Sequence, residues 1–305
     1  MNRFFGWGFA AAILCGTCVF TSCDDKEKEL SQDEQLTQKI LGKWIPVENN
    51  GIEVVTDQKT VTTFKLTGSG LKAFTSVSTF VMPTIPSGQQ TQDDEEYKPD
   101  EWKYNQPADV KVEDGKVILS RAINDTINYI SKIYILENYG STMELYISTL
   151  MEINGQQTLS AMGHTEVWSK MEVDYSNDIL SLWEGRITSD ESKFDDGEPH
   201  RWRYNEDGTY DYYSLDGDSN WYKVNSVFNT YFVDGNLLCT RWKNVGENEV
   251  ENREWWEIES IDADSMKWTA KRREYQMVQG LGGTPIMVPR EYIATFSMAR
   301  IPEKK

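Results

Sequence analysis

Beyond residue 30, short apolar runs alternate with turn residues, and sustained helical periodicity is lacking. The runs are rich in β-branched and aromatic residues and are bounded by Gly, Asn and Asp, a pattern typical of strands joined by tight turns. The clearest predicted strands are 60–66, 116–120, 133–136 and 144–147. Asn154 and Gly155 predict a hairpin, because both residues accept positive φ. The pattern therefore predicts an all-β protein.

One short helix is expected before the first strand. Ser31 and Glu34 form a capping-box pattern ahead of the apolar residues Leu36, Ile40 and Leu41. This pattern satisfies the free N–H groups of the first turn, so it marks where a helix begins.

The second half of the chain repeats the first half in the same order. The matching segments are 40–44 with 179–183, 114–121 with 234–241, and 135–145 with 258–268. Phe64 and Gly68 match Tyr204 and Gly208, and Trp168 matches Phe296. Five matches in one order predict two similar modules, residues 36–172 and 176–303. Many short strands in modules of this length favour antiparallel barrels, which leave no free sheet edge.

Gly42, Lys43 and Trp44 follow the predicted helix and resemble the Gly-x-Trp motif of the lipocalin/calycin superfamily. The order of Trp, Asp-Gly turns, Ser/Thr-Met and a last aromatic strand is similar to that of bacterial lipocalin-like domains, which are common as lipoproteins in Bacteroidota. The resemblance implies two consecutive antiparallel lipocalin-like β-barrels. Ser181 replaces the glycine in the second module, which implies a more open variant there.

The same resemblance implies a structural role for two basic residues near the module ends. Calycins often pack a basic side chain of the last strand across the tryptophan of the first. Lys170 would cover Trp44, and Arg300 would cover Trp183.

The N-terminus resembles a lipoprotein signal over residues 1–22. Arg3 precedes an uncharged apolar run at 4–20, which is too short for a spanning helix. The run ends in Phe20-Thr21-Ser22-Cys23, which resembles a bacterial lipobox with Phe20 in place of the usual leucine. Cys23 is the expected lipidation site. An ordinary secretory signal with a chance cysteine is the alternative.

Residues 23–35 are expected to carry the lipid and an acidic tether. The charged run 24–29 resembles the acidic export signal of Bacteroidota surface lipoproteins. We therefore expect an outer-membrane lipoprotein that is exposed on the cell surface and held by lipid on Cys23. A plain solvated tether on a protein that faces the periplasm is the alternative.

The cysteine count excludes an internal disulfide in the mature chain. Cys15 and Cys18 leave with the signal and Cys23 carries lipid, so Cys239 remains alone. We interpret Cys239 as a small buried apolar side chain.

The net charge of the chain excludes some classes of binding partner. The 305 residues carry a formal net charge of −18, which excludes a nucleic-acid binder and docking on anionic lipid through a basic patch. The acidic segment 86–107 is expected to be a solvated loop, with a recognition lip as the alternative.

The motifs of enzymes are missing, so we expect neither catalysis nor a cofactor. The two histidines, His164 and His200, lie in contexts that do not match, and no nucleophile elbow, phosphate loop or zinc signature is present. No metal site is expected either, because the acidic stretches 195–198 and 216–220 lack calcium-loop spacing and fit hairpin turns.

The best candidate binding surface lies in the second module. His200, Trp202 and Tyr204 alternate onto one strand face, and Trp256 can join them across the barrel. Such a surface predicts a site for a small apolar or amphipathic ligand. Two alternatives stay open: a scaffold protein whose aromatic residues fill the barrels, and a surface glycan-binding protein.

Overall fold

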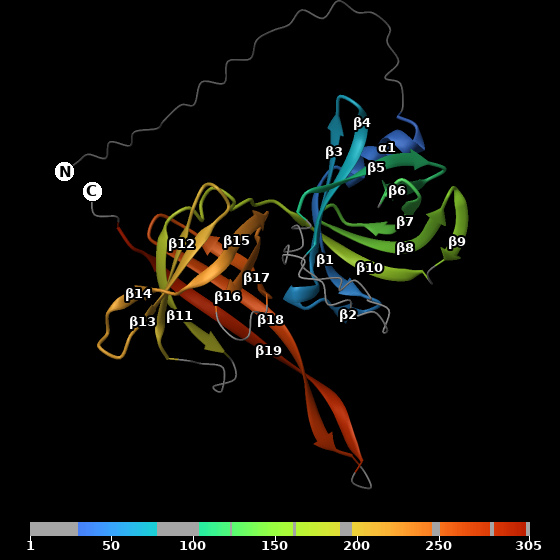
Figure 1. The fold of residues 1–305 in the computed structure, drawn as a ribbon. Coiled ribbons are helices and arrows are strands. Elements are labelled where there is room, and N and C mark those ends of the chain that lie inside the picture. The colour runs from blue at the N-terminus through green and yellow to red at the C-terminus, as the bar shows by residue number, and fades with distance from the viewer. Residues whose placement is uncertain are drawn as a thin grey trace, which may run out of the picture.

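The computed structural model describes residues 30–77, 104–122, 124–160, 163–189, 197–245, 251–280 and 284–302 (Figure 1). The described chain is all-β apart from one α-helix, α1 (Gln32–Ile40), and a 3-10 turn, η1 (Thr56–Gln58). The expected all-β class is therefore confirmed. The signal, Cys23 and the run 24–29 lie outside the described residues.

The first sheet closes into a barrel. Its strands are β1 (Gly42–Asn49), β2 (Ile52–Glu53), β3 (Thr60–Thr67), β4 (Gly70–Val77), β5 (Gln106–Glu113), β6 (Lys116–Ala122), β7 (Ile127–Asn138), β8 (Thr142–Ile153), β9 (Gln156–Ser160) and β10 (His164–Met171). The order runs β10-β1-β3-β4-β5-β6-β7-β8, and pairing of β10 with β8 completes the closed ring of eight antiparallel strands. This barrel is compatible with the lipocalin resemblance.

The second sheet curls in the same way but leaves a gap. Its strands are β11 (Leu182–Ser189), β12 (Pro199–Tyr204), β13 (Tyr210–Leu215), β14 (Trp221–Lys223), β15 (Ser226–Asp234), β16 (Leu237–Asn244), β17 (Glu251–Ile261), β18 (Ser265–Gln279) and β19 (Pro285–Arg300). The order is β14-β13-β12-β11-β19-β18-β17-β16-β15. Among the described residues, the two ends of this sheet meet through one isolated bridge, between Thr209 and Thr230.

Local sequence signals fix the helix start and the hairpins as predicted. The Ser31 hydroxyl accepts from the Glu34 N–H at 3.2 Å, and the Glu34 carboxylate accepts from the Ser31 N–H at 2.7 Å. Asn154 and Gly155 both have positive φ between β8 and β9. The loop expected at 86–107 ends earlier, because Gln106 and Pro107 already pair in β5; the described chain resumes at residue 104.

One hairpin of each sheet has a similar register. Ile135 pairs with Leu145 in the first sheet and Ile258 with Trp268 in the second, and a register shift follows at the same place in both. One predicted match is wrong by two residues. Trp44 pairs with Lys170 and Trp183 with Arg300, so Trp168 corresponds to Met298 instead of Phe296.

The two sheets pack against each other through a shared apolar cluster, which we call the interface cluster. Its buried members are Ile45 and Val61 of the first sheet and Phe232, Leu237 and Cys239 of the second. Met171 and Trp255 pack against it. Cys239 is fully buried and unpaired, as predicted, and burial raises the pKa of its thiol. The outer face of β16 and β17 is therefore covered by the first barrel.

Polar contacts border the interface cluster. Lys43 of β1 reaches Asp234 of β15 at 2.6 Å, and the buried Ser76 hydroxyl donates to Asp234 at 2.5 Å. Thr56 and Lys59 both contact the Glu257 carboxylate at 2.7 Å. These bonds join residues of the two sheets that are far apart in the sequence.

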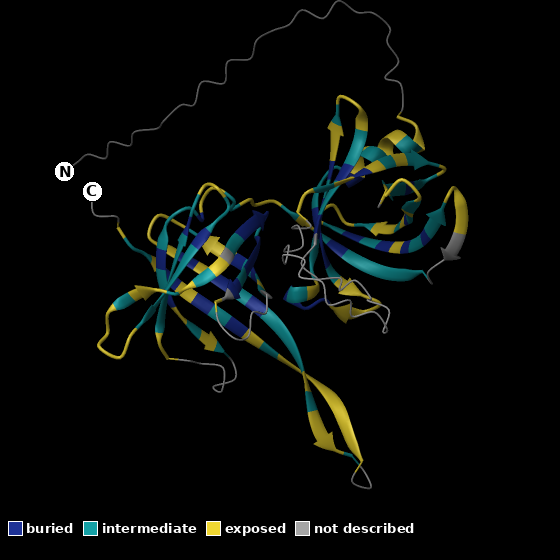
Figure 2. Ribbon diagram, viewed as in Figure 1, coloured by how far each residue is buried: buried dark blue, intermediate teal, exposed yellow. Residues whose placement is uncertain are grey.

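A long hairpin extends from the second sheet. The outer halves of β18 and β19 pair with each other from Lys271 with Ile293 to Gln279 with Pro285, and they form an arm that leaves the barrel (Figure 1). Figure 2 shows that the end of this arm is exposed. Its exposed apolar side chains are Tyr275, Met277, Val278, Ile286, Met287 and Val288. The sequence stretch from Tyr275 to Pro289 carries no charge.

Within the described residues, no helix is both long enough and apolar enough to cross a membrane.

Candidate binding cavity in the second sheet

Alternation along the strands turns one aromatic face toward the inside of the second sheet. His200, Trp202 and Tyr204 share this face on β12, and Trp256 shares it on β17. Strands β13 and β16 add residues at the same two-residue spacing. The interior below them is a core of buried side chains around Trp183, Trp268 and Met298.

The inward side chains leave a cavity of about 390 Å³. Its aromatic lining consists of His200, Trp202, Tyr210, Tyr212, Trp242, Trp256 and Phe296. Ser226, Thr240 and Glu254 supply the polar side chains, and Ile187 and Val224 the aliphatic ones. Val224 lies between β14 and β15 and Ser226 begins β15, so the cavity lies beside the gap in the sheet. Volume and composition are those of a small-molecule site.

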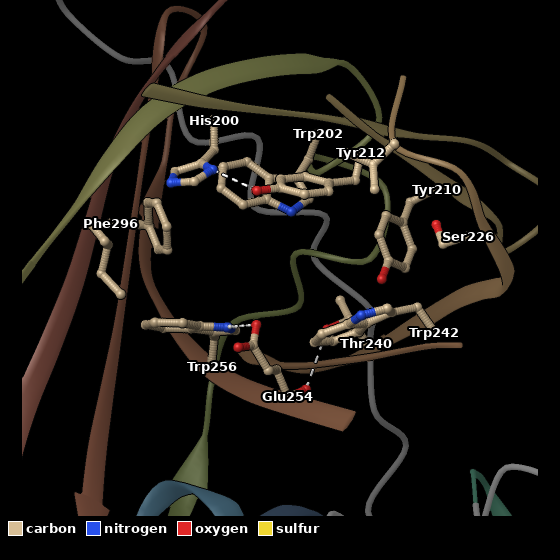
Figure 3. A pocket seen from close by; sticks show the side chains of 12 residues that line it. His200, Trp202, Tyr210, Tyr212, Ser226, Thr240, Trp242, Glu254, Trp256 and Phe296 are labelled. Carbon is tan, nitrogen blue, oxygen red and sulfur yellow. Dashed lines mark hydrogen bonds between the residues drawn. The ribbon is translucent and has the colours of Figure 1, made fainter. Parts of the chain in front are cut away.

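The rings form a slot with a closed end. Trp202 lies on one side of the cavity and Trp256 on the other (Figure 3). Phe296 forms the end wall and stands edge-on to both indoles, at 79° to Trp202 and 72° to Trp256. The two indoles therefore border the cavity from different sides, and Phe296 closes one end of it (Figure 3).

Hydrogen bonds fix the polar groups of the slot. His200 Nδ1 and the Tyr212 hydroxyl are 2.6 Å apart, and their rings stack at 5.8 Å. The Trp256 indole N–H points to the Glu254 carboxylate, at 3.4 Å. Burial and, after it, the charge of Glu254 raise the pKa of the Tyr210 hydroxyl, which therefore stays neutral and able to donate a hydrogen bond.

Three of the four residues predicted for the ligand site line this cavity, namely His200, Trp202 and Trp256. Tyr204 does not line it, although it shares their strand face. It is only 3% exposed and packs edge-on against Tyr231, at 4.8 Å between ring centroids. Burial raises the pKa of its hydroxyl strongly. Tyr204 is thus part of the core and is not placed to orient a ligand.

Sequence reasoning missed several lining residues that carried a readable signal. Glu254 stands two residues before Trp256, so alternation places it on the same face. Tyr210, Tyr212 and Trp242 follow the same rule within their own strands. From the sequence, Phe296 is identified only as a marker of the repeat. Its place at the end of the slot depends on how far the sheet curls, which alternation does not encode.

The residues predicted to be structural lie at equivalent positions in the two sheets. Lys170 Nζ is 5.7 Å from the ring centroid of Trp44, and the guanidinium of Arg300 is 4.5 Å from that of Trp183. Each indole N–H donates to the carbonyl oxygen four residues earlier. Gly42 has a φ of +118°, which favours glycine. The equivalent residue in the second sheet, Ser181, is not one of the described residues that have positive φ.

The acidic stretch at 216–220 forms the turn between β13 and β14. Asp216 accepts hydrogen bonds from the backbone N–H groups of Asp218 and Asn220, which is the role of an aspartate in a tight turn. In the part of the chain that the structure describes, no three metal-ligating side chains come together. Asp195 and Asp196 lie outside the described residues.

Comparisons with known proteins add little to this geometry. No family model and no curated protein matches the chain. A solved structure provisionally described as an outer membrane protein of Bacteroides fragilis is 9% identical and covers 87% of this chain and 99% of its own, with a TM-score of 0.20. A likeness at this level carries no argument about function.

Proposed function

We propose that this protein is a lipid-anchored binding protein of the bacterial cell surface, and that it holds a small amphipathic ligand with a flat apolar body. The slot between Trp202 and Trp256 carries this proposal. Two indole faces offer large apolar contact of defined orientation, and His200, Tyr212 and Glu254 offer polar contacts at the edges. The gap beside Val224 and Ser226 provides a route for a ligand to enter.

The main test is a titration of the whole mature chain with N-phenyl-1-naphthylamine, an uncharged aromatic probe whose fluorescence rises in apolar surroundings. We expect Trp202→Ala to weaken binding by about tenfold or more, because one wall of the slot is lost. Trp221→Ala is the matched control. Trp221 stacks on Arg201, on the outer face of the sheet, so its loss should leave the affinity unchanged.

Equal affinity for the wild type and Trp202→Ala would place the probe elsewhere and remove this cavity from the proposal. Competition by oligosaccharides would favour a glycan ligand. If neither the probe nor an oligosaccharide binds, a scaffold or interaction protein becomes the better interpretation. The exposed arm of β18 and β19 is the feature that favours this second function, since large exposed apolar surfaces mark contact sites.

The anchor is tested separately. The lipobox-like sequence before Cys23 leads us to expect that Cys23→Ser abolishes palmitate labelling and releases the protein from the membrane fraction. Protease added to intact cells should cleave the wild-type chain. Labelling that persists in Cys23→Ser would refute the lipidation site, and cleavage only after lysis would place the protein on the periplasmic side.

A further inference from the structure

Glu254 stands out among the groups that line the slot. It lies on β17, two residues before Trp256, and its carboxylate faces the cavity (Figure 3). Glu254 is exposed, and the described hydrogen bond of its carboxylate comes from the Trp256 indole N–H, at 3.4 Å. Among the described residues that line the cavity, it is the only acidic one, and none is Lys or Arg.

The nearest described basic residues have partners other than Glu254. Arg272 stacks on Trp256, with its guanidinium carbon 4.9 Å from the ring centroid, and donates to the carbonyl oxygen of Trp255 at 2.8 Å. Arg241 lies on the opposite face of β16 from Thr240 and Trp242, and donates to the Thr230 hydroxyl at 3.0 Å. Arg272 thus lies against one indole of the slot, and neither arginine has a described contact with Glu254, whose carboxylate faces the cavity (Figure 3).

A carboxylate among aromatic faces suits one kind of ligand group in particular. The face of an indole or phenol ring carries negative electrostatic potential and attracts cations, and the attraction grows when water is displaced. A cation in the slot would gain both the ring attraction and an ion pair with Glu254. An anion would be repelled by both the rings and the carboxylate. A neutral group would displace water from the carboxylate without supplying a compensating positive charge.

We infer that the ligand of this cavity carries a positively charged nitrogen, an ammonium or amidinium group, which Glu254 holds beside the rings while the flat body of the ligand lies between Trp202 and Trp256. This inference rests on the proposed function and names the ligand class of the same site. A cavity of about 390 Å³ has room for a bicyclic ring with a short amine-bearing arm.

The inference is tested with three probes that share one ring system and differ in charge. Tryptamine is cationic, tryptophol is neutral and indole-3-acetate is anionic at pH 7. Isothermal titration calorimetry on the whole mature chain measures all three without interference from ligand fluorescence. We expect tryptamine to bind about tenfold more tightly than tryptophol, and indole-3-acetate more weakly than both.

The variant Glu254→Gln then isolates the charge. It keeps the shape of the side chain and one oxygen that can accept from the Trp256 indole N–H, so tryptophol should bind as it does to the wild type, while the preference for tryptamine should disappear. Glu259→Gln is the matched control, because this substitution removes an equal charge from the same strand. Glu259 pairs with Lys267 outside the cavity. It should retain the full preference.

Equal affinities of the wild type for tryptamine and tryptophol would overturn the inference, and so would a preference that survives Glu254→Gln. Either result leaves the proposed function standing as long as N-phenyl-1-naphthylamine still binds in a Trp202-dependent way. The wild-type comparison needs no variant, so it decides the inference even if Glu254→Gln disturbs the fold.

Discussion

Replacing Trp183 by alanine is expected to lower the free energy of unfolding by about 3–5 kcal/mol, the usual cost of a large-to-small change in a core. The side chain of Trp183 has no exposed surface. Its indole N–H donates to the Ile179 carbonyl at 2.7 Å, and Arg300 covers its ring. The substitution therefore leaves a cavity and an unpaired buried carbonyl at once. Equilibrium unfolding in guanidinium chloride measures the loss.

Trp221→Ala is the control for this experiment as well. Trp221 is partly exposed, and its described ring contact is with Arg201, at 4.0 Å. Its removal should cost about 1 kcal/mol. Equal losses for Trp183→Ala and Trp221→Ala would show that the buried indole does not organise the second sheet.

Lys43→Met should be nearly as damaging, at about 3–5 kcal/mol, because it leaves the charge of Asp234 buried between the two sheets. The side chain of Asp234 is only 9% exposed, and its other oxygen already accepts from Ser76. The additional variant Asp234→Asn in the Lys43→Met background should recover part of the loss, since it removes the uncompensated charge. If the losses of the two single variants simply add in the double variant, the pair is not coupled and this prediction fails.

The same ion pair predicts how stability varies with pH. Burial alone would lower the pKa of Lys43, but hydrogen bonds to Asp234 and Asp174 outweigh it and raise that pKa above its ordinary value of 10.5. Burial opposes the shift of Asp174 too, yet bonds from Lys43 and Ser176 lower its pKa below 3.8.

The Lys43 contribution is therefore complete below pH 10.5 and is lost as the pH rises through its folded-state pKa. The Asp174 contribution is complete above pH 3.8 and is lost as the pH falls through its folded-state pKa. The stability difference between the wild type and Lys43→Met should stay constant from about pH 5 to 9 and shrink outside that range. Chemical denaturation at a series of pH values checks this expectation.

The sequence by itself determined those features that depend on neighbours along the chain. Ser31 and Glu34 set the start of α1, because a cap needs only residues three apart. Asn154 and Gly155 set a hairpin, because positive φ is a property of the residue. The period of two along 200–204 placed His200 and Trp202 on one face, and the repeated order of segments predicted two similar sheets.

Only the tertiary structure decided what depends on distant segments. Whether a sheet closes is set by the pairing of its outermost strands: β10 meets β8 in the first sheet, whereas the ends of the second meet through the single described bridge of Thr209 with Thr230. That gap leaves the slot open beside Val224 and Ser226. Tyr204 shows the same limit, because alternation predicted which face of β12 it lies on but not that it is buried in the core.

The outer face of β17 is another feature that alternation left undecided. Trp255 and Glu257 alternate with Trp256 and, from the sequence, simply face out of the barrel. In the fold they pack against the first barrel, where Trp255 borders the interface cluster and Glu257 accepts from Thr56 and Lys59. Alternation assigns a residue to one of two faces of a strand. What covers each face depends on chain segments about 200 residues away in sequence, and it is settled only when the whole chain packs.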